Sequence, residues 1–132
     1  MGKLTLSIIF LFLLTLALPA CQKTEGIGGA SQIEGKVRYI KRNSRGDSVA
    51  TYYAPDQKVY IIYGNNTLYD DDMNTNFDGR FRFNYLQKGK YTLYAYSECD
   101  TCLSKKKPVF TRIEVYKKGF TYTASEIVLN NY

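Results

Sequence analysis

The sequence contains no histidine, and this absence excludes a large part of enzyme chemistry. Histidine is the commonest general base and the commonest metal ligand in proteins. Serine, cysteine and zinc-hydrolase sites built on histidine are therefore excluded. A Ser-x-x-Lys spacing occurs at Ser104 and Lys107, but no helical pattern surrounds it to aim one side chain at the other. We therefore expect a protein that is not an enzyme.

Cysteine is also scarce, with three residues in 132, and the first of them ends a hydrophobic leader. Lys3 precedes an apolar stretch at 4–18, which is shorter than the ~20 residues that span a bilayer. The stretch ends in Leu18-Pro19-Ala20-Cys21, which resembles the lipobox of bacterial lipoproteins. The resemblance implies that residues 1–20 are a signal peptide that is removed, and that Cys21 then carries diacylglyceryl and N-acyl chains such as palmitate.

The residue after this cysteine bears on localisation. In the rule for Gram-negative lipoproteins an Asp at this position retains the protein at the inner membrane, and here the residue is Gln22. We therefore expect a lipid-anchored protein of the outer membrane, facing the periplasm or the surface. Of 18 basic residues only Lys3 lies in the leader, which leaves 17 against 12 acidic residues and a net charge of +5. Nucleic acid is not an expected partner of an exported protein; an envelope protein or a glycan is.

A helical period is missing throughout the rest of the chain. Residues 21–31 are rich in glycine and poor in apolar side chains, which predicts a flexible tether. From 32 to 132 apolar residues alternate with polar ones, and Gly, Asn, Asp or Pro recurs about every ten residues. Seven or eight short strands predict an all-β antiparallel sandwich, since each sheet must bury its apolar face against another. The clearest strands are 32–40, 58–63, 80–85, 90–97, 108–117 and 120–129, and the weaker ones are 48–54 and 67–71.

Four segments carry a family resemblance. They are Gln32-Ile33-Glu34-Gly35-Lys36-Val37, Lys58-Val59-Tyr60-Ile61, Asn76-Phe77-Asp78-Gly79-Arg80-Phe81-Arg82-Phe83 and Leu86-Gln87-Lys88-Gly89-Lys90-Tyr91-Thr92-Leu93. In kind and order they are similar to the carboxypeptidase regulatory-like domains, which implies a transthyretin-like (prealbumin-like) sandwich. In the carboxypeptidases zinc and catalysis belong to a separate domain, so the resemblance implies no cofactor. It says little about function, because this architecture hosts many binding and spacer roles.

The other two cysteines, Cys99 and Cys102, lie three positions apart. Outside the cytoplasm such a pair is expected to form a disulfide, here one that closes a loop. A redox motif is the alternative, and it needs a thiolate stabilised by a helix N-terminus or by cations, of which only Lys105 to Lys107 are available. A zinc site needs two more ligands that the chain does not supply.

A run of oxygen-bearing side chains precedes Gly79 and resembles the first half of a calcium-binding loop. Asn74, Asn76 and Asp78 fall at alternate positions, but the position for the bidentate Glu holds Tyr85. A turn rich in Asn and Asp explains the pattern with fewer assumptions. We therefore expect no metal and keep these three residues as a weak calcium candidate.

Tryptophan is absent, whereas tyrosine occurs thirteen times. Tyr94 and Tyr96 alternate with the inward Tyr91 and Leu93, so we expect them to point outward, together with Tyr116 and Tyr122. Such a platform can stack on a sugar or pack against a partner protein. The alternative is that outward tyrosines only favour strand formation.

Arg45-Gly46-Asp47 matches the integrin-binding tripeptide in a predicted loop, although Gly-Asp is also common in turns. The sequence thus predicts a lipid-anchored, non-enzymatic β-sandwich that binds another component of the bacterial cell envelope. The alternatives are a thiol-disulfide redox protein that uses Cys99 and Cys102, and a surface adhesin or glycan-binding lipoprotein.

Overall fold

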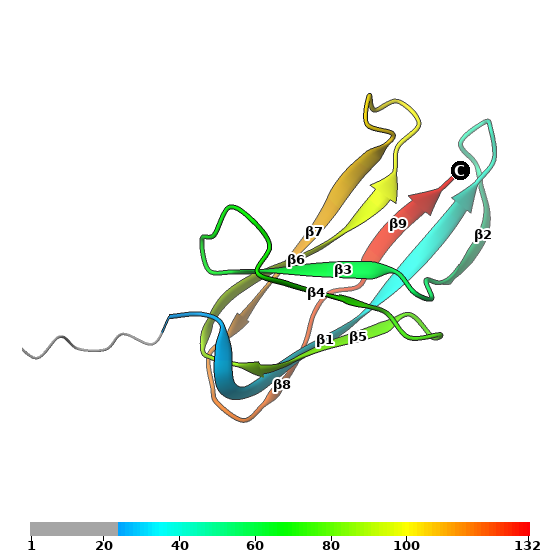
Figure 1. The fold of residues 1–132 in the computed structure, drawn as a ribbon. Coiled ribbons are helices and arrows are strands. Elements are labelled where there is room, and N and C mark those ends of the chain that lie inside the picture. The colour runs from blue at the N-terminus through cyan, green and yellow to red at the C-terminus, as the bar shows by residue number, and fades with distance from the viewer. Residues whose placement is uncertain (1–23) are drawn as a thin grey trace, which may run out of the picture.

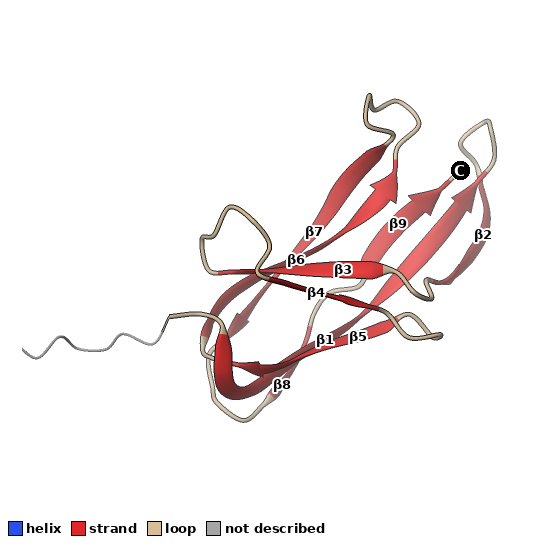
Figure 2. Ribbon diagram, viewed as in Figure 1, coloured by secondary structure: helices blue, strands red, loops and turns tan. Residues whose placement is uncertain are grey.

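The computed structural model describes residues 24–132, which form β-strands joined by turns and loops. The predicted signal peptide and the lipidation of Cys21 fall outside the described residues. No helix in the described part is long and apolar enough to cross a membrane. Figures 1 and 2 show the strands β1 (Ile27–Arg42), β2 (Ser48–Tyr53), β3 (Lys58–Tyr63), β4 (Asp71–Asn74), β5 (Arg80–Leu86), β6 (Gly89–Glu98), β7 (Lys106–Val115), β8 (Thr121–Thr123) and β9 (Ile127–Asn131).

The strands form two sheets. One has the order β4-β3-β6-β7, with antiparallel neighbours throughout. In the other, the long strand β1 is the centre: its first half pairs with β5 and β8, and its second half pairs with β2 and β9. The predicted all-β sandwich is therefore confirmed, with nine strands rather than seven or eight.

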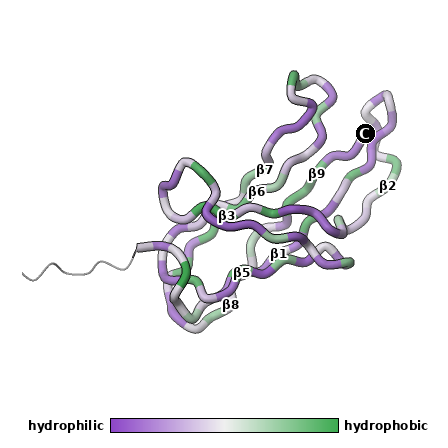
Figure 3. The backbone as a smooth tube through the Cα atoms, viewed as in Figure 1, coloured by the Kyte–Doolittle hydropathy of each residue, from purple (hydrophilic) through white to green (hydrophobic). Residues whose placement is uncertain are grey.

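The core lies between the two sheets, because each strand directs alternate side chains inward. Along β3, Val59 and Ile61 are fully buried, and β6 contributes Tyr91 and Leu93 from the same sheet. The facing residues of the other sheet include Ile33, Val37, Phe81, Phe83, Ile127 and Leu129. Hydrophobic and hydrophilic residues accordingly alternate along the strands in Figure 3. The period of two therefore identified these inward positions, but it fails at Tyr85, where alternation with Phe81 and Phe83 places the ring inward and the side chain is 73% exposed.

Two details of strand placement differ from the sequence-based prediction. The predicted strand at 67–71 is wrong: most of this stretch is loop, and β4 begins at Asp71. The predicted strand at 120–129 is two strands, β8 and β9, and both pair with β1 in parallel. The antiparallel prediction fails here because β7 belongs to the opposite sheet. The chain after β7 therefore crosses between sheets and returns beside β1 in the same direction.

The predicted flexible tether at 21–31 is also wrong in its second half, because β1 begins at Ile27. The pairing of β1 with β5 is irregular between Ile27 and Ile33, and both Ile27 and Ser31 lie opposite Leu86. A Cβ atom on Gly29 would come within 1.9 Å of the Leu86 carbonyl oxygen. Glycine is needed here for a close approach of two backbones rather than for flexibility, and composition alone does not distinguish the two roles.

Candidate binding face

Three aromatic residues lie side by side on the outer face of the β4-β3-β6-β7 sheet. Tyr60 on β3 pairs with Tyr94 on β6, and Tyr94 pairs in turn with Phe110 on β7. The flanking residues Ile61 and Leu93 are fully buried on the inner face. Because successive side chains on a strand point to opposite faces, the three rings stand on the outer face in one row across three strands.

Two further tyrosines extend this row. Tyr69, from the loop between β3 and β4, packs edge-on against Tyr60 with ring centroids 4.9 Å apart. Tyr96, two positions along β6, packs edge-on against Tyr94 at 5.6 Å and against Tyr60 at 5.8 Å. Tyr60 and Tyr94 are stacked at 4.8 Å, and Phe110 is tilted against Tyr94 at 5.3 Å. We call these five residues the aromatic face.

The members of the aromatic face differ in exposure. Tyr94 is only 9% exposed, although it points outward, because rings from both neighbouring strands cover it. Phe110, Tyr69 and Tyr96 are 56%, 50% and 42% exposed. The rings at the periphery are therefore open to a ligand, whereas Tyr94 supports them.

Polar groups adjoin the aromatic face. Lys58 and Asp72, from β3 and β4, form an ion pair at 2.7 Å, and Asp72 is the strand partner of Tyr60. The hydrogen bond and charge of Asp72 raise the pKa of Lys58, so its ammonium stays charged. Burial raises the pKa of Tyr94, as do Tyr96 and Tyr60, so its hydroxyl keeps its proton and remains a donor.

The four tyrosines predicted as one surface do not form one. Tyr94 and Tyr96 belong to the aromatic face, whereas Tyr116 and Tyr122 form a separate edge-on pair at 5.3 Å where the chain turns from β7 to β8. The prediction fails because this turn carries the chain to the other sheet. It also missed Tyr60, Tyr69 and Phe110. Tyr60 and Phe110 could have been predicted to point outward, because Tyr60 alternates with Val59 and Ile61, and Phe110 follows Val109.

The predicted disulfide between Cys99 and Cys102 is present in the loop between β6 and β7, with the Cα atoms 5.4 Å apart. Cys99 is buried, and its backbone amide donates to the Lys105 carbonyl at 2.9 Å. The Lys105 ammonium donates to the Asp100 carbonyl oxygen at 2.7 Å. Lys105, one of the three lysines considered as stabilisers of a thiolate, is therefore engaged with the backbone of the loop.

The residues of the weak calcium candidate serve the turn between β4 and β5. The Asn76 side-chain oxygen accepts from the Arg80 amide at 2.8 Å, and Asp78 forms an ion pair with Arg80 at 2.9 Å. Asn74 donates from its side-chain amide to Asp56 at 2.7 Å. Within residues 24–132 no group of three or more His, Cys, Asp or Glu residues is placed to hold a metal ion.

The Arg45-Gly46-Asp47 tripeptide lies in the exposed loop between β1 and β2. The side-chain oxygen of Asn43 accepts from the backbone amides of Arg45 and Asp47 at 3.0 and 2.9 Å. The loop is therefore an ordered turn built on Asn43.

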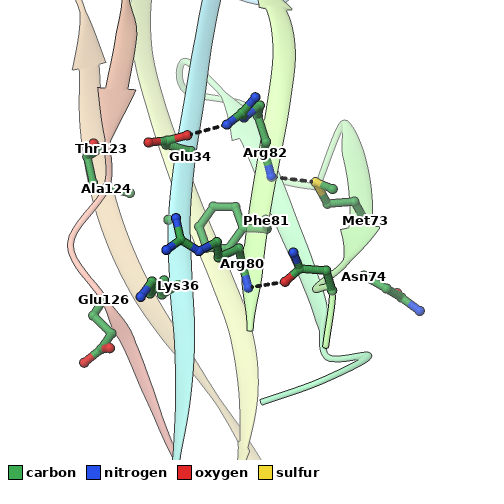
Figure 4. A pocket seen from close by; sticks show the side chains of 12 residues that line it. Glu34, Lys36, Met73, Asn74, Arg80, Phe81, Arg82, Thr123, Ala124 and Glu126 are labelled. Carbon is green, nitrogen blue, oxygen red and sulfur yellow. Dashed lines mark hydrogen bonds and ion pairs between the residues drawn. The ribbon is translucent and has the colours of Figure 1, made fainter. Parts of the chain in front are cut away.

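A groove of about 520 Å³ lies where β1 and β5 approach β4 and the segment before β9. Figure 4 shows its charged side chains, with Glu34 and Arg82 joined by an ion pair at 2.9 Å. Arg80 pairs with Asp78 and Glu126 with Arg38, while the Lys36 ammonium lies 4.5 Å from the centre of the Tyr53 ring. Of the residues that line the groove, only Asn74 and Asn76 belong to a site predicted from the sequence, the weak calcium candidate. Because each of these charged side chains already has a partner within the protein, the groove is a weaker candidate than the aromatic face.

Comparison with known proteins gives little further information. No family model matches the chain, and no curated protein matches it either, so the resemblance to carboxypeptidase regulatory-like domains stays a prediction. Among solved structures, the chain is similar to a "putative carbohydrate binding protein" from Pseudomonas aeruginosa. The identity is 16%, the match covers 85% of this chain and 92% of that one, and the TM-score is 0.46.

Proposed function

We propose that this chain is a lipid-anchored, non-enzymatic binding module of the bacterial outer membrane, and that its aromatic face binds a glycan. The observation that carries the proposal is the continuity of the face, which runs from Tyr69 across three strands to Phe110. Sugar rings present apolar C–H faces that pack on exposed aromatic rings, while tyrosine hydroxyls bond to sugar hydroxyls. The Lys58 and Asp72 side chains add polar partners beside the rings.

The shape of the face favours a long ligand. The exposed rings of Tyr69 and Phe110 lie at the two ends of the row, with Tyr60 and Tyr94 between them. An open face encloses little of any one sugar, so affinity per residue is low and contacts with several successive sugars must add up. A polysaccharide laid across β3, β6 and β7 meets this condition better than a free monosaccharide.

The same surroundings argue against catalysis at this face. The charged groups beside the rings are Lys58 and Asp72, which form an ion pair. A general acid or base usually needs a pKa near the working pH. The partner of Lys58 raises the pKa of this amine still further from neutrality. We therefore assign the face to binding alone.

Affinity electrophoresis through gels containing soluble neutral polysaccharides tests the proposal, with hydroxyethylcellulose, laminarin and a galactomannan as probes. We expect at least one of them to retard the protein, and Phe110→Ala and Tyr69→Ala to abolish the retardation. Both rings are exposed, so their loss leaves no core cavity. Phe77→Ala is the matched control, because Phe77 is an exposed aromatic residue in the turn between β4 and β5. Equal retardation of Phe110→Ala and the native protein would contradict the assignment, as would retardation by none of the probes.

A thiol-disulfide redox function is the second candidate, because the Cys99–Cys102 disulfide is present. Its reduction potential separates the two functions. Structural disulfides lie below about −300 mV, whereas oxidoreductases lie between about −270 and −120 mV. A value in the second range, with turnover of a thiol substrate, would favour the redox function.

A further inference from the structure

The chain enters the sandwich through a tightly held segment. The Gly26 amide donates to the Tyr91 hydroxyl at 3.1 Å, and the Gly26 carbonyl accepts from the Gln87 amide at 2.8 Å. The side chain of Glu25 lies over Gly89: a Cβ atom there would come within 2.0 Å of the Glu25 Cγ atom. The backbone is therefore fixed to the folded domain from Glu25 onward.

This attachment leaves only a short linker between the proposed lipid anchor and the folded domain. Four peptide units separate Cys21 from Glu25. A fully extended chain advances at most ~3.6 Å per residue, so four units span about 14 Å. The inference that follows rests on the proposed lipid anchor. If Cys21 is anchored, Glu25 lies within about 14 Å of the lipid headgroups.

The surface around the entry segment exposes large apolar side chains. We define the entry end as residues 25–27, 85–88 and 116–120. Ile27, Tyr85 and Phe120 are 67%, 73% and 57% exposed, and Tyr116 is exposed as well. Hydrogen bonds hold these segments in place: the Gln87 amide donates to the Gly26 carbonyl at 2.8 Å, and the Ser31 hydroxyl of β1 donates to the Lys117 carbonyl at 2.9 Å.

Backbone strain contributes to this exposure. Tyr85 has a φ of 58°, in the left-handed region that bulky side chains rarely adopt. As a result Asn84 and Tyr85 are both exposed, while Leu86 returns to the core. An alternating strand would have buried one of the two. The fold therefore keeps a tyrosine on the surface at an energetic cost, and such strain is commonly retained at functional positions.

Basic side chains accompany these rings. Lys88, three positions after Tyr85, is exposed, and the Lys117 ammonium lies 6.0 Å from the centre of the Phe120 ring. Aromatic rings with a polar edge are enriched at membrane interfaces, and lysines near the surface are attracted to anionic headgroups. The exposed aromatic and basic side chains of the entry end therefore suit the bilayer surface, and the short linker keeps the entry end close to that surface.

We infer that the entry end of the sandwich lies against the membrane that carries the anchor, with Ile27, Tyr85 and Phe120 at headgroup depth. The strands then lead away from the bilayer. Figure 1 shows the loop between β1 and β2, the loop between β6 and β7, and the C-terminus at the other end of the molecule. The Tyr60, Tyr94 and Phe110 rings of the aromatic face stand on the outer side of the β4-β3-β6-β7 sheet.

Single tryptophan reporters test this orientation, since the native chain has no tryptophan. Phe120→Trp reports on the entry end, and Tyr85→Trp is a second reporter there should the first variant fold poorly. Phe77→Trp is the control, because Phe77 lies at the other end of β5 and is 89% exposed. Each mature lipoprotein is reconstituted into phosphatidylethanolamine and phosphatidylglycerol vesicles, with and without a phosphatidylcholine brominated along its acyl chains. Flotation of the vesicles measures anchoring separately.

We expect all variants to float, and the brominated lipid to quench the indole fluorescence of Phe120→Trp or Tyr85→Trp several-fold more than that of Phe77→Trp. Flotation with equal quenching at both ends, or with none at the entry end, would overturn the orientation and leave the anchor intact. Failure to float, matched by Cys21→Ser, would overturn the anchor and the orientation with it.

Discussion

Replacing Tyr91 by Phe removes one buried hydroxyl and tests how firmly the entry segment is held. Tyr91 is 1% exposed, and its hydroxyl accepts from the Gly26 amide at 3.1 Å and donates to the Gln87 carbonyl at 2.8 Å. Phe keeps the ring and leaves the buried amide of Gly26 without an acceptor. Leaving a buried donor or acceptor unsatisfied costs ~1–3 kcal/mol, so we expect the free energy of unfolding to fall by about 2 kcal/mol.

Urea denaturation followed by circular dichroism measures this loss. For a domain of this size, about 2 kcal/mol lowers the melting temperature by roughly 8 °C. The entry segment should also open more often, so cleavage after Glu25 by a glutamate-specific protease should become faster while the remaining domain stays intact. This second readout separates local release of the segment from general destabilisation.

Tyr122→Phe is the matched control. The Tyr122 hydroxyl also bonds to one backbone amide and one carbonyl, both of Lys117, but this site is exposed, and water replaces the lost bonds. We expect a change below about 0.5 kcal/mol. If Tyr91→Phe lowers the free energy of unfolding no more than Tyr122→Phe does, the hydrogen bonds of Tyr91 do not hold the entry segment. The argument for a short linker between Cys21 and the domain then fails.

Two other perturbations give clear expectations. Replacing both Cys99 and Cys102 by Ser should cost about 2 kcal/mol, because the disulfide closes a loop between residues only three positions apart; thermal denaturation should show a lower melting temperature with an unchanged β-type spectrum. Burial raises the pKa of Tyr39, Tyr63, Tyr91 and Tyr94 above the usual value of about 10, so the native state binds these protons more tightly than the unfolded state. Their stabilisation is complete below pH ~10 and is lost as pH rises through the native values, so urea midpoints should fall above pH ~10; unchanged midpoints there would contradict the burial of these hydroxyls.

Alternation along the strands was enough to predict the two-sheet core but not how the strands pair. Ile61 and Leu93 could be placed inward from the period of two alone, because each strand has one buried face. The parallel pairing of β8 and β9 with β1 depends on which sheet β7 joins, and no local pattern records that choice. The same gap explains why Tyr116 and Tyr122 were grouped with Tyr94 and Tyr96.

The glycine-rich segment was misinterpreted for a different reason. Gly29 permits a backbone contact with Leu86, and Gly89 makes room for Glu25, so both glycines are required by neighbours far away in sequence. Composition reports that side chains are missing and does not report what fills the space. The left-handed conformation of Tyr85 is equally invisible to propensity, because tyrosine is a good strand former.

Ring contacts alone do not make the aromatic face a binding site. Tyr39 and Tyr52 also form a cross-strand pair, at 5.6 Å on the other sheet, and such pairs stabilise a sheet by ~0.2–1 kcal/mol without any ligand. The aromatic face differs because it continues over three strands and recruits Tyr69 from a loop, where no strand register requires an aromatic residue. Tyr69→Ala therefore separates the two roles. If the rings only stabilise the sheet, its effect on polysaccharide retardation should be no larger than that of Tyr52→Ala; a binding face requires loss of retardation for Tyr69→Ala alone.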